Sequence, residues 1–177
     1  MHNGFDGSAE EMHYFGAAAA QERGYYVLSF DGPGQPAARH RDGLVFRPNW
    51  EHVVTPVIDW LRERPEVDES RIAILGASMG GYLAARAAAL EPRLAALMAV
   101  DGVYDLGEIS VGNLPMPREE AEDLLRADSA PEVDAAIDAM MASNATVRWG
   151  VNQGMLATGL DSPTSVPGQL PGLHAAA

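Results

Sequence analysis

Cysteine is absent from this sequence of 177 residues, so disulfide bonds and thiol catalysis are both excluded. Positive charge is scarce: Lys and Arg together number 12 against 25 Asp and Glu, for a net charge of −13. Since a nucleic-acid-binding surface needs a basic face, we expect no nucleic-acid partner. No apolar run is long enough to cross a bilayer. Met1 is followed at once by polar and glycine residues, unlike a signal peptide. We therefore expect a cytoplasmic protein with no membrane partner.

What the sequence does contain is one chemically distinctive turn. Residues 72–75 are a short apolar run with β-branched residues, typical of a buried parallel strand. Residues 82–90 are rich in alanine, which favours helix. Between them, residues 76–80 match Gly-x-Ser-x-Gly with Ser78 at the centre. In that motif a strand turns sharply into a helix and exposes the serine at the apex. The glycines are needed because side chains two positions from the serine would collide with neighbouring backbone.

Two other interpretations of this turn stay open. One is a tight strand-to-helix turn that happens to contain serine. The other is a dinucleotide-binding turn, because an apolar strand followed by glycine begins many of those. That site favours Gly-x-Gly-x-x-Gly, whose middle glycine lets the pyrophosphate approach the backbone. Ser78 occupies the middle position here, so the nucleophile motif is favoured.

The order of apolar runs and breaker residues predicts an α/β fold with a parallel sheet flanked by helices. Apolar strands are expected at residues 25–30, 72–75 and 94–100. Residues 35–48 have no regular pattern and are expected to form a surface loop.

Two early helices have recognisable ends. Ser8 and Glu11 fit a capping box at the start of the first helix, and Gly24 is placed to end it. Asn49 can cap the second helix, expected at residues 50–64 with a kink at Pro56. Its apolar positions at helical spacing are Val53, Val57, Trp60 and Leu61.

From residue 112 onward the pattern becomes helical. Short helices are expected at residues 118–126, 132–142 and 146–156. We expect them to form a helical excursion at about 112–157, packed over the sheet. Residues 161–177 are rich in proline, serine and alanine, and are expected to be disordered.

Four stretches together resemble the α/β-hydrolase superfamily. Residues 2–7 resemble the oxyanion loop that follows the third strand of that family, and residues 30–35 resemble the turn after its fourth strand. Residues 76–81 and 100–105 continue the match. The subgroup that these stretches resemble most is the 2,6-dihydroxypseudooxynicotine hydrolase-like and acyl-peptidase-like serine hydrolases. The resemblance implies an incomplete α/β-hydrolase domain at residues 1–160, as in an internal fragment of a longer hydrolase.

The resemblance also implies a mechanism. Ser78 would be the nucleophile that attacks an acyl carbon. The backbone N–H groups of Met79 and Phe5 would form the oxyanion hole. The reaction would be hydrolysis of an ester, an amide or an activated C–C bond in a small-molecule acyl or ketone substrate. No cofactor and no metal are implied.

Three parts of the family pattern are missing. The family order is Ser, then Asp or Glu, then His, but the only histidine after Ser78 is His174, in the tail. Asp101 and Asp105 are candidates for the acid, but a capping or turn role is the ordinary explanation for either. The third strand of the family is absent too. The strands expected at residues 25–30 and 72–75, which would lie on either side of it, should therefore leave a gap or pair directly. We therefore expect weak activity or none from this chain, and the alternative function is a non-catalytic remnant that binds a ligand or partner.

Overall fold

The computed structural model describes residues 1–105, 108–109, 112, 117–126 and 131–163. By its contacts the chain divides into two units. The strand unit comprises Met1–Leu44 and Asn49–Val103, and the helical unit comprises Val45–Pro48 and Tyr104–Ala177.

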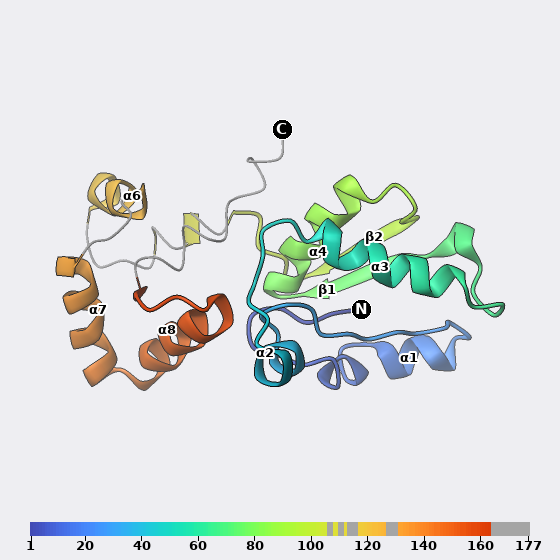
Figure 1. Cartoon of the computed structure of the whole chain (residues 1–177), viewed down its shortest axis with the longest axis horizontal. Helices are drawn as coiled ribbons and strands as arrows, with labels where there is room; N and C mark the ends of the chain where they lie inside the picture. Colours follow the sequence, from blue (N-terminus) through green and yellow to red (C-terminus); the bar gives the residue numbers. More distant parts are fainter. Residues whose placement is uncertain (106–107, 110–111, 113–116, 127–130, 164–177) are drawn as a thin grey trace. The chain divides into compact units, whose positions relative to one another are not determined.

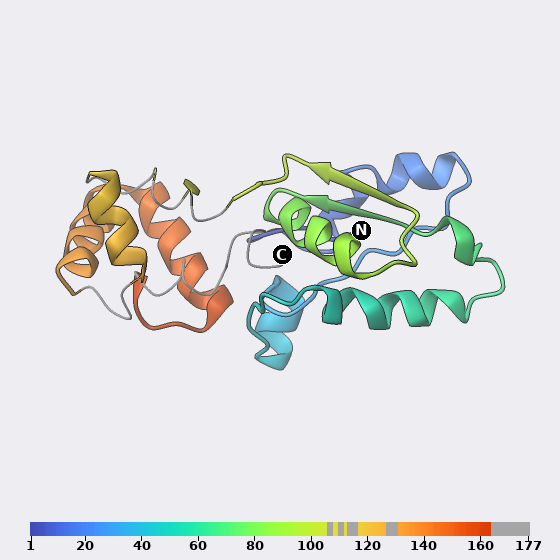
Figure 2. The same cartoon turned by 90° about the horizontal axis from the view of Figure 1, so that it is seen from above.

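The strand unit is built on two parallel strands, β1 (Ala73–Ala77) and β2 (Ala96–Val100), with Ala77 opposite Val100. Helix α4 (Met79–Leu90) follows β1 directly and packs on both strands, and α3 (Glu51–Arg62) packs against α4 (Figures 1 and 2). Small side chains on α4 allow this helix to lie close to the two strands. The predicted succession of strand, Ser78 turn and helix is therefore confirmed.

The first residues of the chain extend this sheet. His2 forms a parallel bridge with Gly76, because its N–H donates to Leu75 O at 3.0 Å and its carbonyl accepts from Ala77 N–H at 3.3 Å. On its other side, Met1 exchanges hydrogen bonds with Leu28 O and Phe30 N–H. The expectation of a gap or of direct pairing is thus wrong, since Met1 and His2 lie between the two neighbouring segments.

The predicted buried strand at residues 25–30 does not form. No regular strand is assigned there, and the exposed fractions of Tyr25 and Tyr26 are 65% and 49%. Only the end of this segment pairs with Met1. A strand needs a partner along its whole length, and Met1 supplies one at a single position.

The predicted first helix is broken in two. A short 3-10 helix, η1 (Glu11–His13), is separated from α1 (Ala17–Glu22) by Gly16, whose φ is 121°. The capping box is wrong: no side-chain cap bond forms, and Glu11 instead accepts a hydrogen bond from the Asn3 amide at 3.1 Å. Gly24 ends α1 with φ 81°, as predicted. Figure 1 shows α1 on the other side of the strands from α4.

Residues 35–48 also differ from expectation, because helix α2 (Pro36–Asp42) forms within the predicted loop. Pro36 stands at its first turn, where a proline needs no N–H partner. In α3 the N-cap position is Trp50, one residue after the predicted Asn49. The buried positions are Trp50, Val54 and Ile58, whereas the predicted apolar face began at Val53 and Val57.

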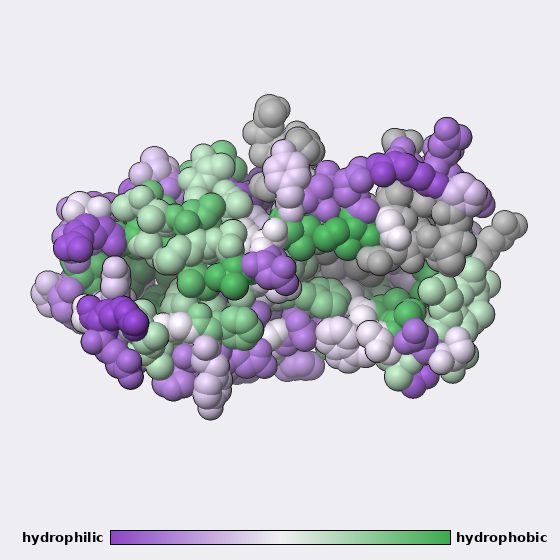
Figure 3. All heavy atoms as spheres, turned by 180° about the vertical axis from the view of Figure 1, so that it is seen from behind, coloured by the Kyte–Doolittle hydropathy of each residue, from purple (hydrophilic) through white to green (hydrophobic). Residues whose placement is uncertain are grey.

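Strand β2 is an edge, and every residue of it is exposed. The exposed fractions are 40% for Leu97, 48% for Met98 and 43% for Val100. Seen from behind, the strand unit presents hydrophobic side chains bordered by hydrophilic ones (Figure 3). An exposed apolar edge strand of this kind can pair with another segment or chain.

The helical unit contains the three predicted helices: α6 (Arg118–Arg126), α7 (Pro131–Ser143) and α8 (Ala145–Thr158). Val133 and Ile137 of α7 form a small apolar cluster with Met141 and Val151. Asn144 caps α8 by accepting from the N–H groups of Thr146 and Val147. The part of the predicted tail after residue 163 lies outside the described residues. None of the helices in the described ranges has the length and hydropathy to span a membrane.

A buried carboxylate joins the end of α4 to α3. Glu91 is 3% exposed, accepts from the Thr55 hydroxyl at 2.7 Å and is held by two guanidinium nitrogens of Arg93 at 2.6 and 2.7 Å. Arg93 also donates to Asp59 at 2.6 Å. The bonds from Arg93 lower the pKa of Glu91 to about 2, against the opposing effect of burial.

Replacing this carboxylate should cost stability in a pH-dependent way. We expect Glu91→Gln to lower the free energy of unfolding at pH 7 by about 2–3 kcal/mol, because Arg93 loses its buried partner. Because the folded pKa lies below the ordinary value of 4.5, the wild-type advantage is complete above pH 4.5 and shrinks towards pH 2. Urea unfolding at pH 7 and pH 3 measures this. Glu63→Gln, at an exposed pair with Arg64, is the control and should change little.

Candidate active site

Ser78 has a backbone conformation that few non-glycine residues adopt, with φ 56° and ψ −131°. It stands between the last residue of β1 and the first of α4. Its N–H donates to Val100 O at 2.8 Å, and its carbonyl accepts from Gly81 N–H at 2.8 Å. Its side chain is exposed while the next residue, Met79, is 4% exposed. Such strain costs about 1–3 kcal/mol and persists only where surrounding contacts impose it.

The glycines on either side of Ser78 have no room for a side chain. A Cβ on Gly76 would lie 2.0 Å from the carbonyl oxygen of Gly80, and one on Gly80 would lie 2.5 Å from Asn3 O. Strand, helix and N-terminal loop therefore touch through their backbones. The predicted reason for the glycine spacing is confirmed.

The N-terminal loop lies against the first turn of α4. A Cβ on Gly4 would be 2.8 Å from Met79 N and 2.7 Å from Gly80 N. Gly4 therefore lies next to Met79. The resemblance implied that the backbone N–H groups of Met79 and of Phe5, the residue after Gly4, are the oxyanion donors. Their catalytic role stays a prediction.

A buried glutamine holds this loop, and the sequence interpretation gave it no role. Gln35 is fully buried, and its amide nitrogen donates to Asn3 O and, at 3.3 Å, to Gly4 O. Its amide oxygen accepts from Gly32 N–H at 2.7 Å. Asn3 adds a bond from Gly4 N–H to its own side chain at 2.8 Å. The one feature of the sequence that could have pointed to this role is the position of Gln35 directly after a glycine-rich turn.

His2 is a second buried polar residue beside the loop. Its Nδ1 lies 3.0 Å from Asn3 O, and its ring stacks at a tilt against Phe30 and Trp50, with centroids 5.3 and 5.5 Å apart. Since a carbonyl only accepts, Nδ1 carries the hydrogen in this contact. Burial lowers the pKa of His2 to about 4, although the bond to Asn3 acts in the opposite direction. His2 is therefore a neutral packing residue near neutral pH.

The structure does not assemble a catalytic triad around Ser78 within the residues that it describes. His2, His13, His40 and His52 make no hydrogen bond to the serine, and His174 lies outside the described range. Asp101 follows β2, next to the residue whose carbonyl accepts from Ser78 N–H, and has φ 54°. Asp105 accepts from Glu108 N–H at 3.1 Å. Among the described residues no His, Cys, Asp and Glu cluster could hold a metal ion.

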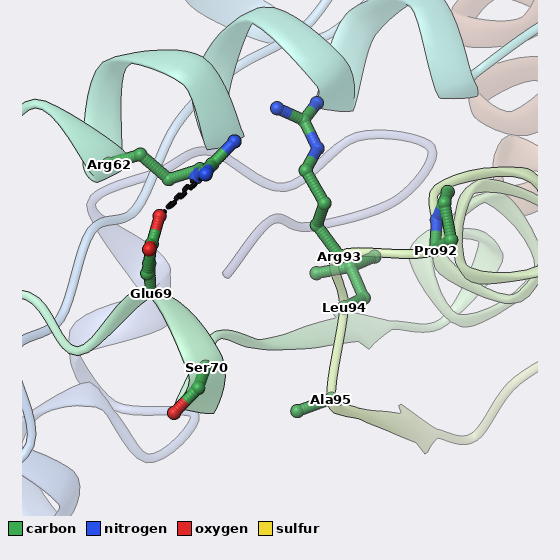
Figure 4. A pocket seen from close by; sticks show the side chains of 7 residues that line it. All are labelled: Arg62, Glu69, Ser70, Pro92, Arg93, Leu94 and Ala95. Carbon is green, nitrogen blue, oxygen red and sulfur yellow. Dashed lines mark hydrogen bonds and ion pairs between the residues drawn. The ribbon is translucent and has the colours of Figure 1, made fainter.

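A shallow pocket of about 340 Å³ lies at the opposite ends of the strands, near η2 (Glu69–Arg71) and the start of β2 (Figure 4). Arg62 and Glu69 face each other there, with guanidinium and carboxylate 2.6 Å apart. Arg93 in the same lining is held by Glu91 and Asp59. Both arginines are therefore paired with carboxylates of the protein itself. The candidate active site is the turn at Ser78, at the other end of the strands.

Comparison with known proteins identifies the family. The profile of the Prolyl oligopeptidase family matches residues 13–161. This chain belongs to that family. It is a family of hydrolases, and the match includes the strand, turn and helix that carry Ser78.

Curated relatives and a solved structure agree with this membership. The chain is 48% identical over 119 residues to Hydrolase acrC of Aspergillus aculeatus, covering 65% of this chain and 28% of that protein. It is 39% identical over 167 residues to 20-hydroxy-prefusarin hydrolase FUS2 of Gibberella moniliformis, covering 92% of this chain and 39% of that protein. The chain thus spans less than half the length of these relatives.

The crystal structure of the 2,6-dihydroxy-pseudo-oxynicotine hydrolase superposes with a TM-score of 0.57 at 27% identity, over 74% of this chain and 36% of that one. The fold is therefore a partial α/β-hydrolase fold: a small parallel sheet flanked by helices. The resemblance drawn from residues 2–7, 30–35, 76–81 and 100–105 is confirmed.

Proposed function

We propose that this chain carries the nucleophile and oxyanion hole of a serine hydrolase, with Ser78 as the nucleophile. The observation that carries the proposal is the backbone of Ser78, at φ 56° and ψ −131°, on a turn that three backbone segments enclose. An ordinary strand-to-helix turn needs no such strain. Membership of a hydrolase family supports the same function over nucleotide binding.

In this proposal the Ser78 oxygen attacks the carbonyl carbon of a small-molecule acyl or ketone substrate. The bond to serine forms as the carbonyl π-electrons move onto oxygen, and the N–H groups of Met79 and Phe5 donate to that oxyanion. The tetrahedral intermediate collapses with loss of the leaving group, and water then releases the acyl group from serine. Bonds within reach of this chemistry are esters, amides and activated C–C bonds.

The proton of the serine hydroxyl needs a base, and the described residues offer no histidine bonded to Ser78. Activity of the chain by itself is therefore proposed to be weak or absent. The second candidate function is a non-catalytic hydrolase-fold remnant that binds a ligand or partner. The observation that favours it is that no histidine within the described residues is bonded to Ser78.

Covalent labelling by a fluorophosphonate distinguishes the two functions. We expect long incubation at high probe concentration to add one phosphonyl group to Ser78, because an oxyanion hole stabilises this attack even without a base. Irreversible labelling accumulates and is seen by intact-mass and peptide mass spectrometry when turnover is too slow to detect.

Two variants serve as controls for this experiment. Ser78→Ala should abolish the adduct, and Ser143→Ala, at an exposed serine on α7, should leave it unchanged. A folded wild-type chain without any adduct at Ser78 would overturn the nucleophile proposal and favour the remnant.

A further inference from the structure

We propose that Gln35 is a positioning residue that locks the oxyanion loop in its donor orientation, an inference that rests on the proposed function. Gln35 comes from the turn before α2, and the loop comes from the N-terminus, so the contact joins segments 31 or more residues apart. The side chain is fully buried. Its two polar atoms face three backbone groups at once.

The peptide unit between Gly4 and Phe5 carries both the carbonyl that Gln35 binds and the proposed donor N–H. In a trans peptide the C=O and N–H groups point in opposite directions, and the peptide bonds in the described part of the chain are trans. The Gln35 amide nitrogen binds Gly4 O at 3.3 Å. Holding this carbonyl on the Gln35 side directs the Phe5 N–H to the other side of the loop.

Glycine makes such a lock necessary. Gly4 has access to both signs of φ, so the peptide that follows it can rotate at little steric cost. Rotation by half a turn would replace the Phe5 N–H with the Gly4 carbonyl oxygen. A carbonyl dipole at that point would repel a developing oxyanion instead of stabilising it. Gln35 opposes this rotation because it would lose its bond to Gly4 O.

The preceding peptide shows how the loop is braced. Asn3 O accepts from both Gln35 and His2, while Gly4 N–H donates to the Asn3 side chain. That peptide is therefore held at both ends by side chains. Glu11 in turn holds the Asn3 amide at 3.1 Å. Gln35 links this braced peptide to the next one through a single amide nitrogen.

The orientation of Gln35 is fixed by its other end. Its amide oxygen accepts from Gly32 N–H at 2.7 Å, so the nitrogen must face the loop. Gly32 packs against the buried Trp50, since a Cβ there would lie 2.6 Å from the indole ring. The turn at residues 31–34 thus supports Gln35, and Gly32 contributes both to this turn and to the packing against Trp50.

Labelling kinetics of Ser78 test the proposal. Two variants remove the donor: Gln35→Met replaces the amide by an apolar chain of similar length, and Gln35→Glu at pH 8 keeps an acceptor for Gly32 N–H. We expect each to lower the maximal fluorophosphonate labelling rate, kinact, by about 10–100-fold, which is at or below the roughly 10²–10³-fold effect of removing one oxyanion donor outright. The half-saturating concentration, KI, should change less than threefold. Gln21→Met, at an exposed glutamine of α1, should change neither constant.

The outcomes separate this inference from the proposed function. Wild-type chain that is never labelled at Ser78 would overturn the proposed function. Wild-type labelling with unchanged kinact in both Gln35 variants would overturn the positioning role alone. If the variants melt at a lower temperature but kinact, measured below that temperature, is unchanged, Gln35 has only a structural role. That result would also overturn the positioning role. Reduced kinact in both variants, in samples that melt above the assay temperature, supports the lock.

Discussion

Purified chain and its Ser78→Ala variant are expected to hydrolyse p-nitrophenyl acetate at the same near-background rate. Serine is a poor nucleophile unless a base lies within hydrogen-bond reach, about 2.6–3.2 Å. Within the described residues no histidine is bonded to Ser78. The residual catalysis that an oxyanion hole and binding leave in related enzymes, about 10³–10⁴ over water, survives the loss of any triad member, so it does not distinguish wild type from Ser78→Ala.

The histidine after Ser78 in the sequence provides the decisive variant. His174→Ala should have the same rate as wild type, because no predicted strand precedes this residue to hold it near the serine. A clear Ser78-dependent rate that also disappears in His174→Ala would show that the tail completes a triad. Fluorophosphonate labelling without turnover would, by contrast, fit an intact nucleophile that lacks its base.

The sequence predicted the candidate site better than it predicted the sheet. The turn at Ser78 was predictable because its main constraint is local: a Cβ on Gly76 would collide with the backbone of Gly80, so glycine is the residue that fits there. The helices α6, α7 and α8 were predictable for a similar reason, since capping residues and helical periodicity are local signals. Asn144, which caps α8 in the structure, is a local signal of this kind that the sequence prediction did not use.

Features that depend on distant partners could not be predicted in this way. Residues 25–30 have strand-forming side chains, but a strand forms only where a neighbour pairs with it, and Met1 offers one position. Glu11 has the spacing of a capping residue, but the Asn3 amide competes for its carboxylate. Gln35 was visible in the sequence, yet its role depends on a loop more than 30 residues away.

Replacing Gly76 by alanine is expected to destroy the site. Its Cβ would lie 2.0 Å from the carbonyl oxygen of Gly80 and 2.4 Å from its carbonyl carbon, which are backbone atoms of the first turn of α4. Overpacking against side chains costs about 1–3 kcal/mol, and backbone that cannot rotate away should cost at least the upper end of that range. Relief requires α4 to move off β1, which would also break the bond between Gly81 N–H and Ser78 O. We therefore expect a large loss of melting temperature and no labelling of Ser78.

A matched substitution distinguishes this collision from a general effect of glycine replacement. Gly150 lies inside α8, and a Cβ there meets no atom within 4 Å. Gly150→Ala should leave labelling intact and add up to about 1 kcal/mol of stability through helix propensity. Thermal unfolding and intact-mass labelling of both variants provide the comparison. If Gly76→Ala melts within a few degrees of wild type and still labels at Ser78, the strand and helix are not held by backbone contact. In that case the strain at Ser78 would need another cause.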